Sequence, residues 1–176
     1  MRGLTVSQEP DDAVPVQTGQ EQALADERYI AEKSWSEGNA NLSPAEQAAF
    51  ERELARAGLT ANRIRHVIEF GFGQGCLLRY GRTRGWAMLG VEQNATLIGW
   101  ARKQGFPAFH ASGTSALPAS SADLIVALDV LEHIGRSELV PFLIEVDRLL
   151  RPSGTFIARF PNGDSPFGLA NQNGDH

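Results

Sequence analysis

The chain has 176 residues, of which 42 % are hydrophobic and 21 % charged, as is typical of one globular domain. Sixteen lysines and arginines against 21 aspartates and glutamates give a net charge of −5, which argues against a generic nucleic-acid or anionic-membrane surface. The single cysteine, Cys76, excludes an internal disulfide and a cysteine-based zinc site. No apolar run approaches the roughly 18 residues of a membrane span, and the first residues lack a secretory apolar core. We therefore expect a soluble cytoplasmic protein.

The N-terminal third is predicted to form a tail and a helical cap. Residues 1–22 are acidic and poor in large apolar side chains, so we expect a disordered acidic tail there. A short helix is predicted over residues 29–35. A capping box, Ser-Pro-Ala-Glu at residues 43–46, predicts a second helix that Gly58 closes. Residues 23–60 are thus interpreted as an N-terminal helical cap.

From residue 61 onward, short apolar segments alternate with amphipathic ones. The apolar segments predict five strands, at residues 66–71, 87–92, 107–111, 122–129 and 154–160. Asn94 and Ser137 are expected to cap two of the helices between them. This alternation predicts an α/β fold, with a mostly parallel sheet and helices on both faces.

The most informative segment is the glycine-rich loop at residues 69–75, which reads Glu-Phe-Gly-Phe-Gly-Gln-Gly and follows the first predicted strand. Its glycines let the backbone turn sharply and approach a ligand closely. A dinucleotide fold would require glycine at position 76, where this chain has Cys76. Glu69 would repel a pyrophosphate but suits an ammonium or sulfonium. Glu92, at the end of the second strand, can accept hydrogen bonds from both ribose hydroxyls.

These features indicate a site for a nucleoside joined to a cationic group. A glycine-rich turn without a ligand is the open alternative. Four segments, at residues 67–75, 89–94, 122–134 and 148–162, together resemble class I S-adenosylmethionine-dependent methyltransferases. The resemblance implies a Rossmann-like sheet in the order 3-2-1-4-5 and S-adenosylmethionine as cofactor, lying across the carboxyl ends of strands 1, 2 and 4.

The resemblance also implies roles for particular residues. Those expected to bind the cofactor are Glu69, Gly71, Phe72, Gly73 and Gly75 at the methionine moiety, Glu92 at the ribose, Gln93 beside the adenine, and Asp129 near the methionine. Family members often place an aspartate after the third strand to bind the adenine amino group. This chain has no acid there, and Ser112 or a backbone carbonyl is expected to substitute.

His133, which follows the fourth strand, is the candidate catalytic residue, because a hydroxyl acceptor needs a general base. An alternative is that Glu132 and His133 only brace the start of the next helix. A metal site formed by Asp129, Glu132 and His133 is a further alternative, although we expect no metal.

The predicted function is methyl transfer from S-adenosylmethionine to a small-molecule or glycan-type acceptor, at oxygen or nitrogen. The N-terminal helices, with Tyr29, Lys33 and Trp35, and the loop at residues 160–168 are expected to shape the acceptor site. Two other readings remain open, a cofactor-binding module without turnover and a nicotinamide-dependent oxidoreductase.

The family fold ordinarily has seven strands, whereas five are predicted here. We therefore expect the hairpin of strands 6 and 7 to be missing and the domain at residues 61–176 to be incomplete at its C-terminal end. The fifth strand would then be an exposed edge, able to pair with another chain.

Overall fold

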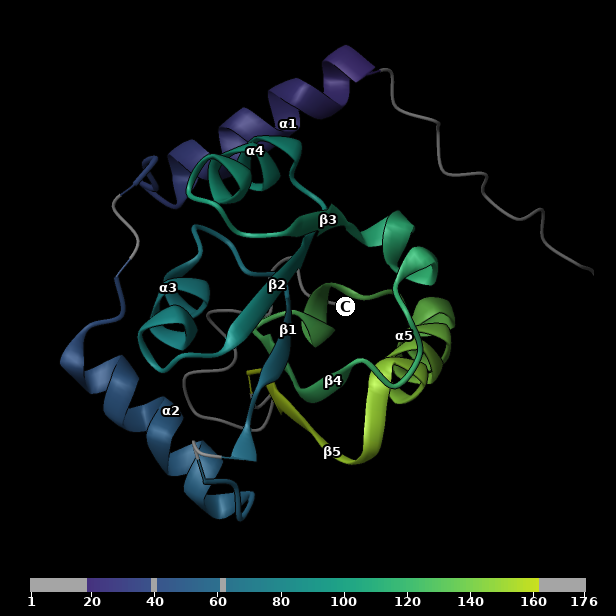
Figure 1. Cartoon of the computed structure of the whole chain (residues 1–176). Coiled ribbons are helices and arrows are strands. Elements are labelled where there is room, and N and C mark those ends of the chain that lie inside the picture. Colours follow the sequence, from purple (N-terminus) through teal and green to yellow (C-terminus); the bar gives the residue numbers. More distant parts are fainter. Residues whose placement is uncertain (1–18, 39–40, 61–62, 162–176) are drawn as a thin grey trace, which may run out of the picture.

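A computed structural model describes residues 19–38, 41–60 and 63–161 (Figure 1). Its centre is a sheet of five strands in the order β3-β2-β1-β4-β5, with every neighbouring pair parallel. The strands are β1 (His66–Phe70), β2 (Ala87–Glu92), β3 (Ala108–His110), β4 (Ala122–Leu128) and β5 (Leu150–Arg159). The predicted α/β class and strand order are both confirmed.

Helices lie on both sides of the sheet (Figure 1). They are α1 (Gly19–Glu32), α2 (Pro44–Arg56), α3 (Cys76–Thr83), α4 (Ala95–Lys103) and α5 (Arg136–Leu149), with short 3₁₀ turns η2 (Ala111–Ala116) and η3 (Leu131–His133). α3 and α4 pack on β2, α1 contacts α4, and α5 packs against β5. No helix in the described ranges is long and apolar enough to cross a membrane.

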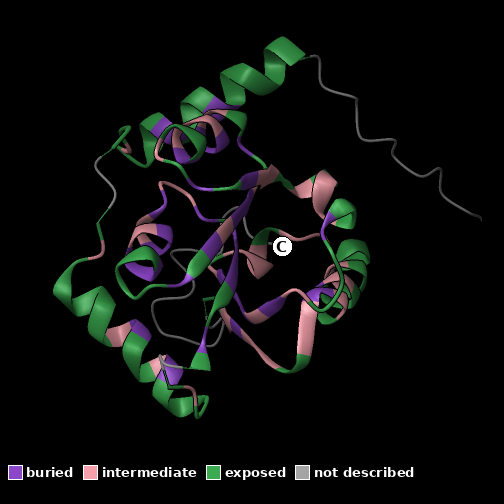
Figure 2. Ribbon diagram, viewed as in Figure 1, coloured by how far each residue is buried: buried purple, intermediate pink, exposed green. Residues whose placement is uncertain are grey.

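Successive residues of β4 enter two different cores. Leu124 and Val126 belong to the core shared with α3 and α4, whereas Ile125 and Ala127 belong to the core shared with Leu149 of α5. All five side chains are fully buried. A strand covered on both faces needs apolar residues at every position, which explains its continuous apolar run. Figure 2 shows this burial in the sheet and the exposed outer surfaces of α1 and α2.

Helix α1 is fixed to the start of α4 by two hydrogen bonds that Asp26 accepts. The buried Asp26 carboxylate accepts from the backbone N–H of Ala95 at 2.9 Å, and the Asn94 side chain donates to the Asp26 carbonyl oxygen at 3.1 Å. Asn94 also accepts from the backbone N–H of Leu97, so it caps α4 as predicted. These contacts place α1 beside the carboxyl end of β2, where the candidate site lies.

The N-terminal predictions are partly wrong. Residues 19–22, placed in the predicted tail, belong to α1, in which Gln22 donates to Asp26 one turn later. This helix ends at Glu32, so the predicted helix over residues 29–35 is only its last turn and the loop after it. The physical reason is the tertiary contact with α4, which stabilises a segment with little apolar surface. Residues 1–18 lie outside the described ranges.

The other boundaries differ in smaller ways. The predicted capping box is confirmed, since Ser43 and Glu46 exchange both hydrogen bonds and begin α2. α5 begins one residue before Ser137, because the carbonyl of Gly135 accepts the first hydrogen bonds of the helix. β3 is shorter than predicted and β5 begins earlier, at Leu150. The predicted missing hairpin falls beyond residue 161, outside the described ranges.

Candidate cofactor site

A cavity of about 1200 Å³ opens at the carboxyl ends of β1, β2 and β4. α1, α2 and the segment after β4 complete its wall. Most of the sequence-predicted site residues line this one cavity: Glu69, Gly71, Phe72, Gly73, Glu92, Gln93, Asp129 and His133. Gly75 and Ser112 do not line it.

The glycine loop needs its glycines for both conformation and space. Gly71 and Gly73 have φ angles of +64° and +54°, which favour glycine. A Cβ at Gly71 would lie 2.4 Å from Val130, and one at Gly73 would lie 2.7 Å from the indole ring of Trp35. The loop is therefore pressed between the segment after β4 and the segment after α1. Gly75 lies behind it and begins α3 in a left-handed conformation.

Glu92 holds the loop against the end of β2. One carboxylate oxygen accepts from the backbone N–H of Gly73 at 3.1 Å, and the other accepts from Gln93 and Asn94 at 2.8 and 3.3 Å. An ionised carboxylate has about four acceptor positions, and these three bonds leave about one, on Oε2, for a hydroxyl donor. The geometry thus leaves room for a hydrogen bond from one ribose hydroxyl.

Glu69 is an ionisable group with little access to water. Its side chain is 5 % exposed, and its Oε2 atom has no hydrogen-bond partner among the described residues. Burial, reinforced by the negative charge of Glu92, raises the pKa of Glu69 well above its usual value of 4.5. A buried acceptor at the wall of a cavity fits a ligand that brings a cation or a hydrogen-bond donor.

Two predicted residues have different surroundings from those expected. The ring of Phe72 packs on Gly90 of β2, where a Cβ would lie 2.5 Å from it, so Phe72 anchors the loop to the sheet. Ser112 is exposed and pairs with the His110 imidazole at 2.8 Å. Thr114 of the same 3₁₀ turn lines the cavity instead. This geometry gives no support to the predicted adenine contact of Ser112.

Asp129 forms an ion pair that sequence reasoning missed. The Arg159 guanidinium at the end of β5 donates to its carboxylate, and the Asp129 backbone N–H donates to the Arg159 carbonyl at 2.7 Å. The hydrogen bond from Arg159 to Asp129 raises the pKa of the guanidinium. Parallel pairing of β4 with β5 was the signal available, because it brings the ends of these two strands together.

Cys76 is half-buried and lines the cavity. Burial and the nearby Glu46 raise the pKa of its thiol. In the described parts of the chain, no three His, Cys, Asp or Glu side chains are placed to share a metal ion. Asp129, Glu132 and His133 are therefore not arranged as the metal site considered above.

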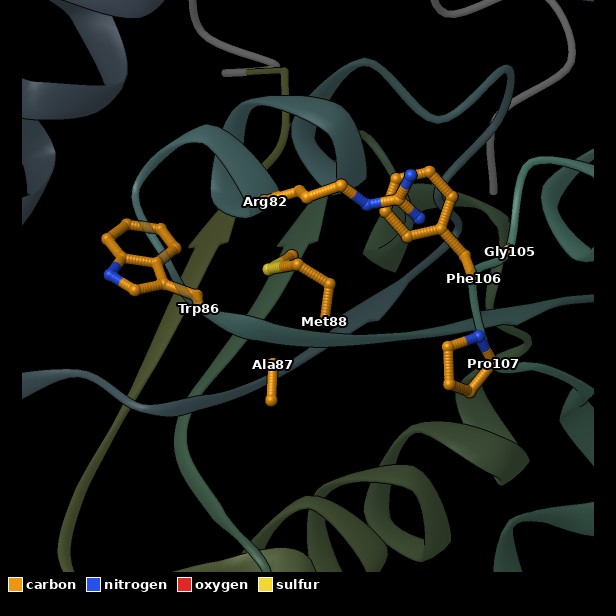
Figure 3. Close-up of a pocket in the computed structure, with 7 residues that line it drawn as sticks. All are labelled: Arg82, Trp86, Ala87, Met88, Gly105, Phe106 and Pro107. Atoms are coloured by element: carbon orange, nitrogen blue, oxygen red, sulfur yellow. The ribbon is translucent and has the colours of Figure 1, made fainter.

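A second, smaller cavity of about 240 Å³ lies near the start of β2 (Figure 3). The Arg82 guanidinium lies 3.5 Å from the centroid of the Phe106 ring, and it donates twice to the Gln104 carbonyl at 3.0 Å. The Arg82 guanidinium is therefore engaged in contacts that join α3 to the segment after α4.

Comparison with known proteins agrees with this geometry. Residues 68–158, just over half of the chain, match the family model described as a methyltransferase domain. The chain therefore belongs to the methyltransferase domain family. None of the curated proteins compared with the chain matches it.

Solved structures share the fold at low sequence identity. A SAM-dependent methyltransferase from Archaeoglobus fulgidus has a TM-score of 0.61 and 21 % identity over 73 % of this chain and 59 % of that one. The PH0226 protein from Pyrococcus horikoshii OT3 has a TM-score of 0.62 and 18 % identity, and the match covers 82 % of this chain and 71 % of that one. Coclaurine N-methyltransferase bound to N-methylheliamine and S-adenosylhomocysteine has a TM-score of 0.52 and 20 % identity, and the match covers 70 % of this chain and 38 % of that one. The chain thus spans 59 % of the length of the Archaeoglobus protein.

The cofactor of this class is S-adenosylmethionine, and the cavity fits it. The buried Oε2 atom of Glu69 lacks a donor, as a site for an ammonium group requires. Glu92 retains about one acceptor position for a hydroxyl, and a side chain at Gly71 or Gly73 would collide with Val130 or Trp35.

The raised pKa of Glu69 predicts a stability that falls as pH increases. Above pH 4.5 the unfolded chain releases this proton, whereas the folded chain retains it up to the raised pKa, so rising pH favours unfolding. Glutamine does not titrate, so Glu69→Gln should remove this pH dependence. The free energy of unfolding of the variant, relative to that of the native protein, should therefore increase from pH 5 to 7. Urea unfolding at several pH values measures this, with Glu53→Gln, a carboxylate change outside the cavity, as control. A constant difference between Glu69→Gln and the native protein would contradict the assignment.

Glu92→Ala is predicted to weaken the binding of S-adenosylhomocysteine by about 1–3 kcal/mol, because it removes charge-assisted hydrogen bonds and releases the Gly73 N–H. Isothermal calorimetry measures the dissociation constant, and circular dichroism confirms folding. Glu53→Ala, a carboxylate deletion on the exposed side of α2, should leave affinity unchanged. An unchanged dissociation constant for folded Glu92→Ala would place the ribose elsewhere.

Proposed function

We propose that the protein transfers a methyl group from S-adenosylmethionine to a small-molecule or glycan-type acceptor, at oxygen or nitrogen. The observation that carries this proposal is the pair of carboxylates, Glu69 and Glu92, on either side of the glycine loop at one large cavity. The methyltransferase domain match supports it. The cytoplasmic location and the absence of a nucleic-acid partner, both inferred from composition, belong to the same proposal.

Four groups of this chain would hold the cofactor. Glu69 would accept from the ammonium of its methionine part, Glu92 from the ribose hydroxyls, and Gln93 would lie beside the adenine. The backbone of the glycine loop at Gly73 would lie against the methionine part of the cofactor. When bound, the cofactor supplies a methyl group made electrophilic by a sulfonium sulfur. The protein then contributes mainly alignment of the acceptor with that methyl group.

His133 is proposed to remove the proton of the acceptor. It lies in η3, directly after β4, and its exposed imidazole lines the same cavity as Glu69 and Glu92. A neutral imidazole can take a proton from a hydroxyl or an ammonium at neutral pH. The alternative, a bracing role at the start of α5, predicts lost stability rather than lost turnover.

Two other functions differ from this proposal in what they bind or do. A cofactor-binding module would bind S-adenosylhomocysteine without turnover. A nicotinamide-dependent oxidoreductase would need room for a pyrophosphate at the glycine loop, where the buried Glu69 stands. Pairing with a second chain through β5, at the edge of the described sheet, also stays a prediction.

His133→Ala should lower turnover about 10²- to 10⁴-fold, the usual share of general acid–base catalysis. Affinity for S-adenosylhomocysteine should barely change, since the imidazole is proposed to face the acceptor. Formation of S-adenosylhomocysteine with a panel of phenol and amine acceptors measures turnover, normalised to the folded fraction. His110→Ala, outside the cavity, is the control. Full turnover per folded His133→Ala molecule would leave only the bracing role.

A further inference from the structure

The wall of the cavity carries a large excess of negative charge. Eight aspartates and glutamates line it in the described residues, against one lysine and one arginine. The cofactor itself carries one net positive charge, from an ammonium, a sulfonium and a carboxylate. The wall therefore remains strongly negative when the cofactor is bound, and it would repel an anionic acceptor.

Most of these carboxylates already have partners. Asp129 pairs with Arg159, and Glu145 pairs with Arg148 at 2.7 Å. Asp26 and Glu92 accept from backbone N–H groups near the start of α4. These four carboxylates are therefore already engaged in contacts within the fold.

Glu132 differs from them. It lies in η3 beside His133, and its Oε2 atom is closed off from solvent without a hydrogen-bond partner among the described residues. Glu132 lines the same cavity as Tyr29 and Trp35. Its negative charge, after burial and Glu92, is also among the causes that raise the pKa of Tyr29. The charge of Glu132 also contributes to raising the pKa of the Arg159 guanidinium, but the hydrogen bonds of Arg159 go to Asp129.

Two aromatic rings from the end of α1 and the segment after it line the same cavity. The rings of Tyr29 and Trp35 are 5.5 Å apart and nearly perpendicular, at 86°. The ammonium of Lys33 already lies 5.6 Å from the centroid of the Tyr29 ring. Perpendicular aromatic faces with a nearby carboxylate are the surroundings that proteins use to bind ammonium groups.

We propose, building on the methyl transfer proposed above, that the acceptor is a small amine whose ammonium form binds between Glu132 and the rings of Tyr29 and Trp35. Glu132 is the specificity-determining residue, because it separates cationic from neutral and anionic acceptors of the same shape. This selects nitrogen as the methylated atom.

The reaction requires the ammonium to become a neutral amine first. His133 takes one N–H proton, which leaves the nitrogen lone pair free to attack. The nitrogen forms a bond to the methyl carbon while the carbon–sulfur bond breaks, and that electron pair goes to sulfur, which becomes a neutral thioether. The product nitrogen carries the positive charge, and His133 releases its proton to water.

The test uses three probes of similar shape and different charge: benzylamine, benzyl alcohol and benzoate. Their affinities are measured at pH 7 by ligand-observed NMR, with and without S-adenosylhomocysteine. We expect benzylamine to bind at least about tenfold more tightly than the other two, and Glu132→Gln to abolish that preference, as expected for hydrogen bonds to a charged group. Glu53→Gln makes the same charge change outside the cavity and should preserve the preference.

A second variant tests the aromatic part independently. Lys33→Gln removes the ammonium that competes for the Tyr29 ring, so benzylamine should bind about 2- to 5-fold more tightly. Equal affinity for the three probes, or a preference unchanged in Glu132→Gln, would overturn the amine proposal. Failure of S-adenosylhomocysteine to bind would instead overturn the proposed methyl transfer. The affinities of the three probes measured in the absence of S-adenosylhomocysteine would still show whether the cavity prefers a cation.

Discussion

The hydrogen bond from the backbone N–H of Gly73 to the Glu92 carboxylate connects the parts of this molecule that form the cavity. It joins the glycine loop after β1 to the end of β2. Trp35 covers Gly73 from the other side, and only glycine leaves space for its ring. A change at Glu92 would therefore affect the loop and the packing of Trp35 together.

The second link in this arrangement is the contact between α1 and α4. Asp26 accepts hydrogen bonds from Asn94 and Ala95, which follow Glu92 by two and three residues in the chain. The position of α1, and with it that of Tyr29, is thus set by the same strand end that positions Glu92. The walls of the cavity formed by α1 and by the end of β2 are therefore joined by one connected set of polar contacts.

Features encoded by neighbouring residues were predictable from the sequence. The apolar segments predicted the strands, and the family resemblance implied their order. The Asn94 cap and the capping box at Ser43 each depend on residues within one turn. The start of α1 was not predictable, because it depends on a buried contact 69 residues away. The pairing of Asp129 with Arg159 likewise needs the parallel alignment of β4 and β5.

The candidate site shows the same division. The spacing of Glu69, the glycines and Glu92 located the cavity correctly, since strand ends meet at one edge of a parallel sheet. The sequence could not show that Ser112 turns outward to His110, because that depends on a local hydrogen bond in η2. Nor could it show the buried, unpartnered oxygen of Glu132, which depends on what surrounds η3.

Glu69 illustrates how the site differs from the rest of the fold. Asp123, near the start of β4, accepts from two backbone N–H groups and from Arg151, and these bonds lower its pKa despite the opposing effect of burial. Glu69 is more deeply buried, and its backbone hydrogen bond from Leu78 does not offset burial and the charge of Glu92, so its pKa is raised. A buried carboxyl oxygen without a partner destabilises a fold unless a ligand uses it.

The most direct test of this account is calorimetric titration of the purified chain with S-adenosylhomocysteine and, separately, with NAD. The proposed function predicts saturable binding of S-adenosylhomocysteine with one site per chain and no measurable binding of NAD, because an acid next to the glycine loop disfavours a pyrophosphate there. Binding of NAD without binding of S-adenosylhomocysteine would contradict the assignment of the cavity.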